Sequence, residues 1–374
     1  MKKKSVAILA VLLPLQIVAV RILSRYPDFV EQWYSKIIYP EISGNLRRGL
    51  SWIPFSLGDL LYTFLGILVI RWLFHRIQQG FKHPGRWITH AMAGLSVLYA
   101  CFNLFWGLNY YRPPLHQTLE IAHDYNTQEL LALTRQLVEQ SNSLQVEITG
   151  DDSTKVVVPY SKSQLLDLAL EGFTHLQKDF PQLQYKHPSL KRSLYSIPLT
   201  YMGFNGYLNP FTNEGQVNTQ IVPYRIPTTA SHEIGHQLGF AAENEANFIA
   251  CLATMNHPDV YFRYSGYTFA LSYSLSELGR RDPELAAEVL GTIHEGVLEN
   301  YREVQQFWEA HKNPFEPVFM FTYNSYLKAN NQADGMKSYS YVVALLVNYL
   351  QQEAAALRFN LNTGNDEMQI PEAI

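Results

Sequence analysis

The chain has 374 residues, of which 47% are hydrophobic and only 17% charged, and its net charge is −4. Average soluble chains carry about 25% charged residues, so this chain is poor in charge, and the deficit lies in its first third. The length exceeds that of one small domain, and the acidic balance excludes a broad basic surface for nucleic acid. We therefore expect two parts, residues 1–111 and 112–374, and no nucleic-acid partner.

Three apolar stretches in the first part predict membrane-spanning helices, at about 5–23, 55–74 and 87–108. Each has roughly the 20 residues that a helix needs to cross a bilayer core about 30 Å thick. No small-residue cleavage site follows the first stretch, so a retained signal anchor fits better than a cleaved signal peptide. Three buried helices of a soluble core are the alternative, which is less favoured because core helices rarely stay apolar all round.

Positive charges predict the orientation of these spans. Lysines occupy positions 2–4 before the first span, and the short loop region after the second span is also basic, with Arg71, Arg76, Lys82 and Arg86. The positive-inside rule places both regions in the cytoplasm. The loop at about 25–54 then lies outside by alternation, and so does everything after about residue 110. We expect a multi-pass membrane protein in contact with the lipid bilayer, with a cytoplasmic N-terminus.

The second part has the pattern of a helical domain with a few short strands. Apolar spacing predicts a helix at about 127–142, and residues 161–164 form a capping-box pattern before another helix. The stretch at about 183–227 is rich in Gly, Asn and Tyr, which predicts loops and short strands. Asp282-Pro283 predicts the start of one long helix that runs to about 311. A further helix is expected at about 338–357.

The stretch 228–255, TTASHEIGHQLGFAAENEANFIACLATM, contains an H-E-x-x-H motif. His232 and His236 are four residues apart, so on a helix they share a face and can direct two imidazoles at one metal ion. Glu233 flanks that site and can take a proton from a metal-bound water. The alternative is a pair of histidines without a metal. The motif helix is expected to begin at a capping hydroxyl, one of Thr228, Thr229 and Ser231.

A catalytic zinc usually has three protein ligands and one open position, so a third ligand is expected close to the motif. Gly239 can end the motif helix, and a second helix can begin at Glu243. The string Glu243 to Asn247 resembles the E-x-x-x-D pattern of gluzincin families, with Asn247 in place of the aspartate. By that match Glu243 is the ligand, and Asn247 orients a histidine from outside the ligand set. Because the connection is short, Glu245 stays open as an alternative.

These residues predict Zn²⁺ as the cofactor and hydrolysis of a peptide or protein substrate by a zinc-activated water, with Glu233 as general base. Residues 214–224 predict an edge strand that pairs with an extended peptide, and the loop 203–212 is expected to line the cleft. Two alternatives stay open, an extracytoplasmic zinc-binding sensory protein without turnover and a zinc amidase that acts on cell-wall material. The donor that stabilises the oxyanion is left undecided among Tyr323, Tyr326, Tyr339 and Tyr341.

The whole chain resembles a family of uncharacterised bacterial membrane proteins, found largely in the Bacteroidetes, whose function is unknown. The resemblance covers nearly the full length and is carried by the spans and by three strings, FNGYLNPFTNE, HEIGHQLGFAAENEANF and YLKANNQADGMKSYSYVV. It implies a bacterial inner-membrane protein with a few N-terminal spans and an extracytoplasmic, zincin-like (gluzincin-type) H-E-x-x-H domain. It implies a peptidase, and it brings no substrate.

Overall fold

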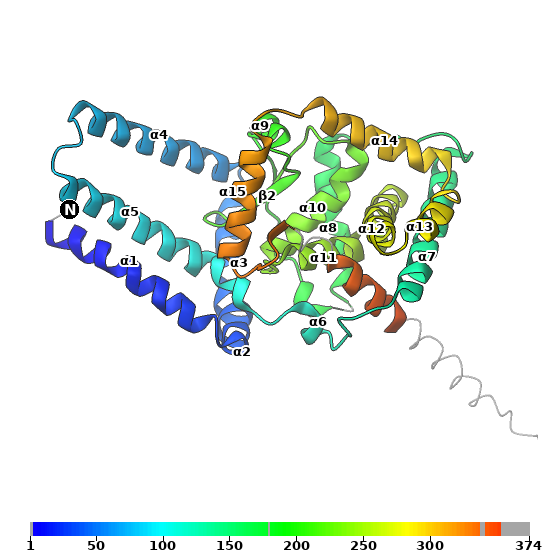
Figure 1. Cartoon of the computed structure of the whole chain (residues 1–374), viewed down its shortest axis with the longest axis horizontal. Helices are drawn as coiled ribbons and strands as arrows, with labels where there is room; N and C mark the ends of the chain where they lie inside the picture. The colour runs from blue at the N-terminus through cyan, green and yellow to red at the C-terminus, as the bar shows by residue number, and fades with distance from the viewer. Residues whose placement is uncertain (1–2, 179, 337–340, 353–374) are drawn as a thin grey trace, which may run out of the picture.

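The computed structural model describes residues 3–178, 180–336 and 341–352, and it consists of a helical globular part from which three long helices extend (Figure 1). Helices account for 72% of the described residues, which also contain one sheet of three short strands. The prediction of a mainly α protein with a few strands is therefore confirmed.

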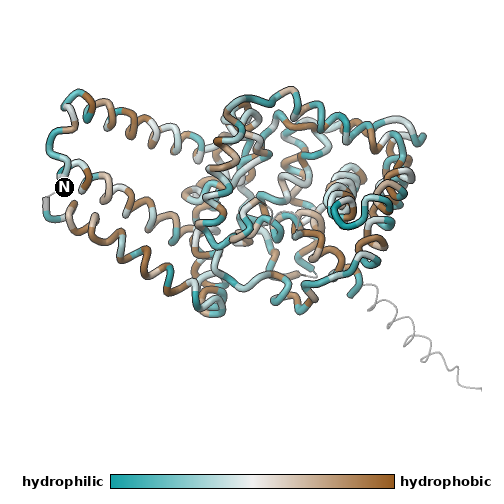
Figure 2. The backbone as a smooth tube through the Cα atoms, viewed as in Figure 1, coloured by the Kyte–Doolittle hydropathy of each residue, from teal (hydrophilic) through white to brown (hydrophobic). Residues whose placement is uncertain are grey.

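The three extended helices are α1 (Lys3–Leu23), α4 (Leu57–Gln78) and α5 (Pro84–Phe105). All three are long and apolar enough to cross a membrane, as predicted, and Figure 2 shows hydrophobic residues along each of them. Helix α1 packs along α5, whereas α4 diverges from both in Figure 1 and contacts α5 only near their connecting turn, where the rings of Trp72 and Trp87 lie 6.2 Å apart. The N-terminal end of α1 and the turn between α4 and α5 lie at the same far end, which is the arrangement that three alternating spans require.

The segment between the first two candidate spans is helical and packs against the globular part on the side from which these spans leave (Figure 1). We call this segment the platform. It comprises α2 (Pro27–Phe29), the π-helix η1 (Val30–Ile38) and α3 (Tyr39–Leu50). A short 3₁₀ helix, η2 (Gly107–Tyr111), follows α5 and packs on this platform. The shared apolar cluster includes Tyr34, Tyr39 and Trp106, together with Ala241 from the globular part. Buried contacts therefore cross from the first part of the chain to the second.

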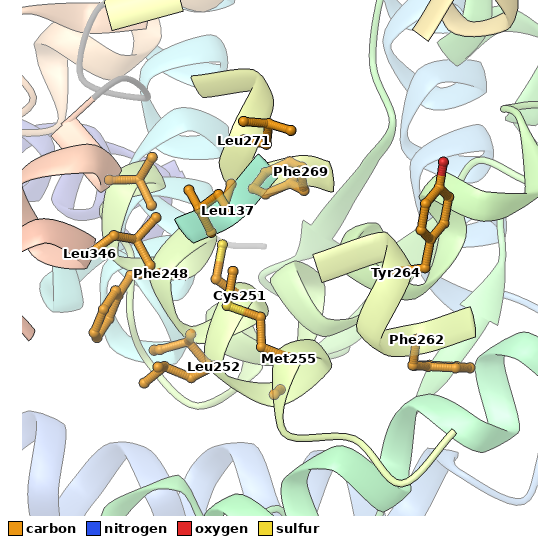
Figure 3. Packing of buried hydrophobic residues seen from close by; sticks show 14 of the residues in the cluster. Leu137, Phe248, Cys251, Leu252, Met255, Phe262, Tyr264, Phe269, Leu271 and Leu346 are labelled. Atoms are coloured by element: carbon orange, nitrogen blue, oxygen red, sulfur yellow. The ribbon is translucent and has the colours of Figure 1, made fainter. Parts of the chain in front are cut away.

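The core of the globular part lies among long amphipathic helices. Helix α12 packs on α7 and α11 (Glu243–Met255), and Figure 3 shows apolar side chains of these helices meeting around Cys251. Helix α8 begins with the predicted capping box, in which Ser161 and Gln164 each bind the other's backbone N–H. Helix α7 begins with a second such box at Asn126. The bounds are α6 (Leu115–Thr118), α7 (Thr127–Thr149), α8 (Lys162–Leu176), η3 (Pro181–Leu183), α9 (Ser196–Tyr201), η4 (Pro223–Arg225) and α12 (Val260–Arg281).

The predicted long helix from 282 to 311 is instead two helices, α13 (Pro283–Leu290) and α14 (Glu295–Ala310). Asp282 caps the first one as predicted. The N–H groups of Thr292 and Ile293 still bind carbonyls of the preceding helical turn. The helix stops there because His294 binds α7 instead. The N–H of His294 donates to Asn142 Oδ1 at 2.9 Å. This contact between distant segments is invisible in the local pattern, and the prediction of one helix is wrong.

The sheet contains β1 (Leu190–Arg192), β2 (Gly206–Asn209) and β3 (Glu214–Val217) in the order β1-β3-β2. Strand β3 is parallel to β1 and antiparallel to β2. The prediction of an edge strand at 214–224 is therefore wrong, because β3 is the central strand and both of its sides are paired. The residues that follow β3 leave the sheet and lead into the helix that carries the motif.

Two helices close the described chain. Helix α15 (Glu316–Ala329) crosses the edge of the globular part that faces the candidate spans (Figure 1). An apolar helix follows at Val342–Gln352. It confirms the middle of the helix predicted at 338–357, and the remainder of that prediction lies outside the described residues.

Candidate metal centre

Helices α10 (Ile226–Gln237) and α11 (Glu243–Met255) carry the motif residues and cross closely. A Cβ at Gly235 would lie 3.3 Å from Ala246 Cα, so the absence of a side chain there permits the approach. Gly239, with φ of 90°, ends the α10 segment and reverses the chain, as predicted. The five residues between the helices are enough because this reversal is tight.

Helix α10 begins earlier than the sequence suggested. No side chain caps it, and its first residues are Ile226 and Pro227. Thr228 already lies in the first turn, where its hydroxyl donates to the Arg225 carbonyl at 3.1 Å. The expectation of a cap at Thr228, Thr229 or Ser231 is therefore wrong, because Pro227 starts the helix upstream of them.

The crossing brings His232, His236 and Glu243 together, with their candidate ligand atoms within 4.8 Å of one another. The Nε2 atoms of His232 and His236 lie 3.2 and 3.4 Å from the same oxygen, Glu243 Oε2. His236 and Glu243 are buried, and His232 is largely so. Three candidate ligands thus point at one small volume.

The second nitrogen of each imidazole is held by an acceptor. His236 Nδ1 lies 2.7 Å from the Phe240 carbonyl, and His232 Nδ1 lies 2.9 Å from Asn247 Oδ1. A carbonyl oxygen only accepts, so Nδ1 carries a hydrogen, and Nε2, which faces Glu243, is the nitrogen left to bind a metal ion when the ring is neutral. Two imidazole lone pairs and a carboxylate oxygen are a donor set that suits Zn²⁺, and the outer acceptors are those typical of zinc-binding histidines.

Electrostatics at the cluster favour a cation. Burial opposes the charge on Glu243, but His236 and the hydrogen bonds from both histidines hold its pKa well below the usual range. Burial lowers the pKa of His236, yet the Glu243 carboxylate more than offsets this and raises that pKa to about 9. A positive charge at Nε2, whether a proton or a metal ion, is what the arrangement stabilises.

Glu233 lies beside the cluster and against the sheet. A Cβ at Gly206 of β2 would lie 2.6 Å from Glu233 Oε1, so the glycine makes room for the carboxylate. Burial raises the pKa of Glu233 to about 8. Its Oε2 atom is buried and has no hydrogen-bond partner among the described residues. An unpaired buried carboxylate oxygen costs free energy, which a ligand or water at this position would relieve.

Glu245, the alternative third ligand, lies elsewhere. Its Oε1 atom accepts a hydrogen bond from the Leu115 N–H at 2.6 Å, and burial raises its pKa to about 7. The structure therefore brings Glu243, and not Glu245, to the two histidines.

Among the late tyrosines, Tyr323 reaches the cluster. Its hydroxyl donates to Glu243 Oε1 at 2.8 Å, which leaves Oε2 for the histidines. The Tyr326 hydroxyl lies 3.2 Å from that of Tyr110, and Tyr341 binds Asp334 at the surface. Tyr339 lies outside the described residues.

Sequence reasoning missed how the end of α10 is held. The carbonyls of its last turn have no partner within the helix, and donors from the segments that adjoin the candidate spans bind them. Tyr39 and Arg47 both donate to the Gln237 carbonyl, at 2.9 and 3.1 Å. Trp106 donates to the His236 carbonyl at 3.2 Å. No local sequence signal connects these residues with a helix that lies more than a hundred positions away.

Arg112 completes this support. Its guanidinium donates to the Gly239 carbonyl at 2.9 Å and pairs with Glu31 of η1 at 2.8 Å. It also lies over the Phe240 ring, 4.4 Å from the ring centroid. Phe240, whose carbonyl orients His236, thus packs against the Arg112 guanidinium, and Glu31 of η1 holds that guanidinium in place.

A family model described as a protein of unknown function (DUF3810) matches residues 34–347. The match includes two of the three candidate spans, the membrane-side platform from Tyr34 onward and all residues of the candidate metal centre. Comparison with curated proteins and with solved structures found no match.

Proposed function

The chain belongs to the DUF3810 family, and we propose that it is a membrane-anchored zinc metallopeptidase. In this proposal His232, His236 and Glu243 hold the metal, and Glu233 is the general base. The observation that carries it is the convergence of two Nε2 atoms on Glu243 Oε2, with both Nδ1 atoms already bound to acceptors. The buried, unpaired oxygen of Glu233 beside this donor set supports hydrolysis over a purely structural metal site.

Bound at these residues, zinc would lower the pKa of a water to about 7 and polarise a scissile carbonyl. The chain's own groups then divide the remaining work. Glu233 accepts a proton at its free oxygen and passes it to the leaving amine. Asn247 and the Phe240 carbonyl keep the imidazoles in one tautomer and orientation. Tyr323 donates to Glu243 Oε1, which leaves Oε2 of that carboxylate to hold the metal.

We further propose that the globular part is extracytoplasmic and the N-terminus cytoplasmic. The N-terminal end of α1 and the α4–α5 turn lie at the same end of the helices (Figure 1), and both regions are rich in lysine and arginine. A cysteine introduced in the turn at Gln79 is expected to resist an impermeant thiol reagent added to intact cells. A cysteine at exposed Gln306 is expected to react, and the reverse result would invert the topology.

The test of the metal site is the zinc content of the full chain purified in detergent. Because residues of η1, α3 and η2 hold the motif helix, the isolated part 112–374 is not a suitable sample. About one zinc per chain is expected in the wild type. His236→Ala and Glu243→Gln are expected to lose the metal. Glu233→Gln and the matched control Glu245→Gln are expected to keep it.

Hydrolysis separates the proposal from its alternatives. With a peptide library as probe, Glu233→Gln is expected to abolish cleavage while its zinc content equals that of the wild type. If the folded wild type prepared with zinc holds none, the metallopeptidase proposal is refuted. If it holds zinc but cleaves no peptide, a zinc-binding sensory protein or an amidase of cell-wall material takes its place.

A further inference from the structure

Helix α15 has an unusual surface for a helix of a globular part. Phe315, just before it, and Val318 and Phe321 within it are 67%, 59% and 73% exposed. Between residues 314 and 326 none of the exposed side chains is charged. The neighbouring helix α14 shows the ordinary pattern, since its exposed positions are mostly glutamine and glutamate. The outer face of α15 is therefore too apolar to suit contact with water.

The position of α15 next to the candidate spans indicates which other environment this face contacts. In Figure 1 it crosses the edge of the globular part from which the candidate spans leave. Near its C-terminal end the Tyr326 ring lies 6.4 Å from the Phe102 ring of α5. At its other end Asn313 donates to the Tyr201 carbonyl of α9 at 2.6 Å. Tyr195, just before α9, donates at 2.8 Å to the backbone carbonyl of Asp59 in α4. Helix α15 thus bridges the ends of two candidate spans.

The exposed apolar surface continues from α15 onto α9, where Leu194 and Ile197 are 55% and 63% exposed. We call Leu194, Ile197, Phe315, Val318 and Phe321 the membrane-side patch. A second apolar stripe follows directly after α1, formed by Phe29, Trp33 and Ile37 of α2 and η1, each more than half exposed. Exposed apolar patches mark interaction sites, and both of these adjoin the ends of helices long enough to cross a bilayer.

The candidate metal centre lies directly behind this surface. Tyr323, on the inner face of α15, binds Glu243. The ring of His236 lies 6.0 Å, edge to face, from the ring of Trp106, which follows α5 at once. One candidate ligand thus contacts the end of a candidate span, and another contacts the helix that carries the patch.

We propose that the membrane-side patch is embedded in lipid, in the leaflet next to the globular part, and that the candidate metal centre consequently acts on peptides held at the bilayer surface. The second step rests on the proposed metallopeptidase function, whereas the first does not. Amphipathic helices that lie in the interface plane bury their apolar face in the headgroup and acyl boundary, and the outer face of α15 matches that placement.

The lipid contact is tested on the full chain in liposomes with nitroxide labels at Val318→Cys and Phe321→Cys. The background carries Cys101→Ala, and Cys251 stays because it is fully buried, which raises the pKa of its thiol to about 12. The matched control is Leu290→Cys, which replaces an apolar residue that is 49% exposed on α13, far from the spans (Figure 1).

At positions 318 and 321 oxygen, which concentrates in lipid, is expected to collide with the label more often than a water-soluble nickel chelate does. At position 290 the reverse is expected. Equal access of the chelate to all three labels would overturn the proposal. So would labels at 318 and 321 that are immobile and shielded from both reagents, because a protein partner would then cover the patch.

The substrate class is tested in the same liposomes with one peptide library offered free and with an N-terminal palmitoyl anchor. The anchored library is expected to be cleaved at least about tenfold faster, and Phe321→Ser is expected to reduce that advantage without slowing cleavage of the free library. Equal rates for both libraries would refute the substrate step. An absence of zinc and of all cleavage would refute the proposed function, and the label measurements would still decide the lipid contact.

Discussion

Replacing Asn247 with leucine removes the acceptor 2.9 Å from His232 Nδ1 and leaves the size of the side chain similar. His232 then loses the group that fixes its tautomer and ring orientation. Such outer partners of metal-binding histidines are worth 10- to 100-fold in metal affinity, or about 1.4–2.8 kcal/mol. We expect the zinc dissociation constant of Asn247→Leu to rise within that range. Asn247→Asp keeps an oxygen at the same place, and a carboxylate partner makes imidazole a stronger ligand, so its affinity is expected to equal or exceed that of the wild type.

The assay is competition between the full chain in detergent and a fluorescent zinc chelator of known affinity. Thermal unfolding of the zinc-free proteins provides the control, because a loss of affinity is informative only if both variants are folded. A leucine variant that binds zinc as tightly as the wild type would refute the reasoning, since it would show that Asn247 does not orient His232 for a metal. A loss in Asn247→Asp as large as in Asn247→Leu would also contradict it.

Three further predictions concern other parts of the structure. Gly206→Ala places a Cβ 2.6 Å from Glu233 Oε1. It is expected to cut peptide hydrolysis by about 100-fold with unchanged zinc content, and normal turnover would contradict this. Glu214→Gln replaces a buried carboxylate with an amide. It thereby weakens the hydrogen bond that Glu214 accepts at 2.6 Å from the Gly58 N–H at the start of α4. It is expected to lower the free energy of unfolding by about 1.5–3 kcal/mol, seen as a lower thermal midpoint in detergent, and an unchanged midpoint would argue against it. Burial lowers the pKa of His257 below its ordinary 6.5, so the unfolded chain binds a proton that the folded chain does not. Stability is expected to fall as the pH drops below about 6.5, and thermal unfolding of His257→Gln should show a smaller dependence.

The spacing of the sequence predicted the candidate ligands, and geometry explains why. His232 and His236 are one helical turn apart, and Gly239 forces the tight reversal that brings Glu243 back to them. The resemblance to the gluzincin pattern favoured Glu243, but the spacing left Glu245 open, because the choice depends on which side of α11 faces α10. The close approach at Gly235 settles that orientation in the structure.

Partners that come from distant segments could not be predicted. Tyr323 was one of several equivalent late tyrosines until the fold placed α15 beside Glu243. The carbonyl of Phe240 has no signature at all, since every residue has one. Gly206 lay in the predicted loop 203–212, where the structure instead has β2, and the need for a glycine there follows only from the position of Glu233.

The same limit applies to the fold. The candidate spans and the capping box at 161–164 are local patterns, and they were found where expected, whereas the box at Asn126 was not predicted. The break after Leu290 and the central place of β3 depend on which segments pair across long separations. We expected a loop between the spans where the structure has the platform, residues 27–50. Its order depends on contacts with the end of α10, which a local sequence pattern does not show.

The way α10 is held at its C-terminal end has a consequence for biosynthesis. Tyr39, Arg47, Trp106 and Arg112 donate to its last carbonyls and to the turn that follows. These donors are synthesised long before His232, and they lie next to the candidate spans, which in the proposed topology enter the membrane first. Domains generally fold from the N-terminus during synthesis, so the motif helix is expected to emerge with its anchoring groups already in place. In that topology the first part of the chain acts as an internal template for the site, and a chain whose spans fail to insert should leave that helix unanchored.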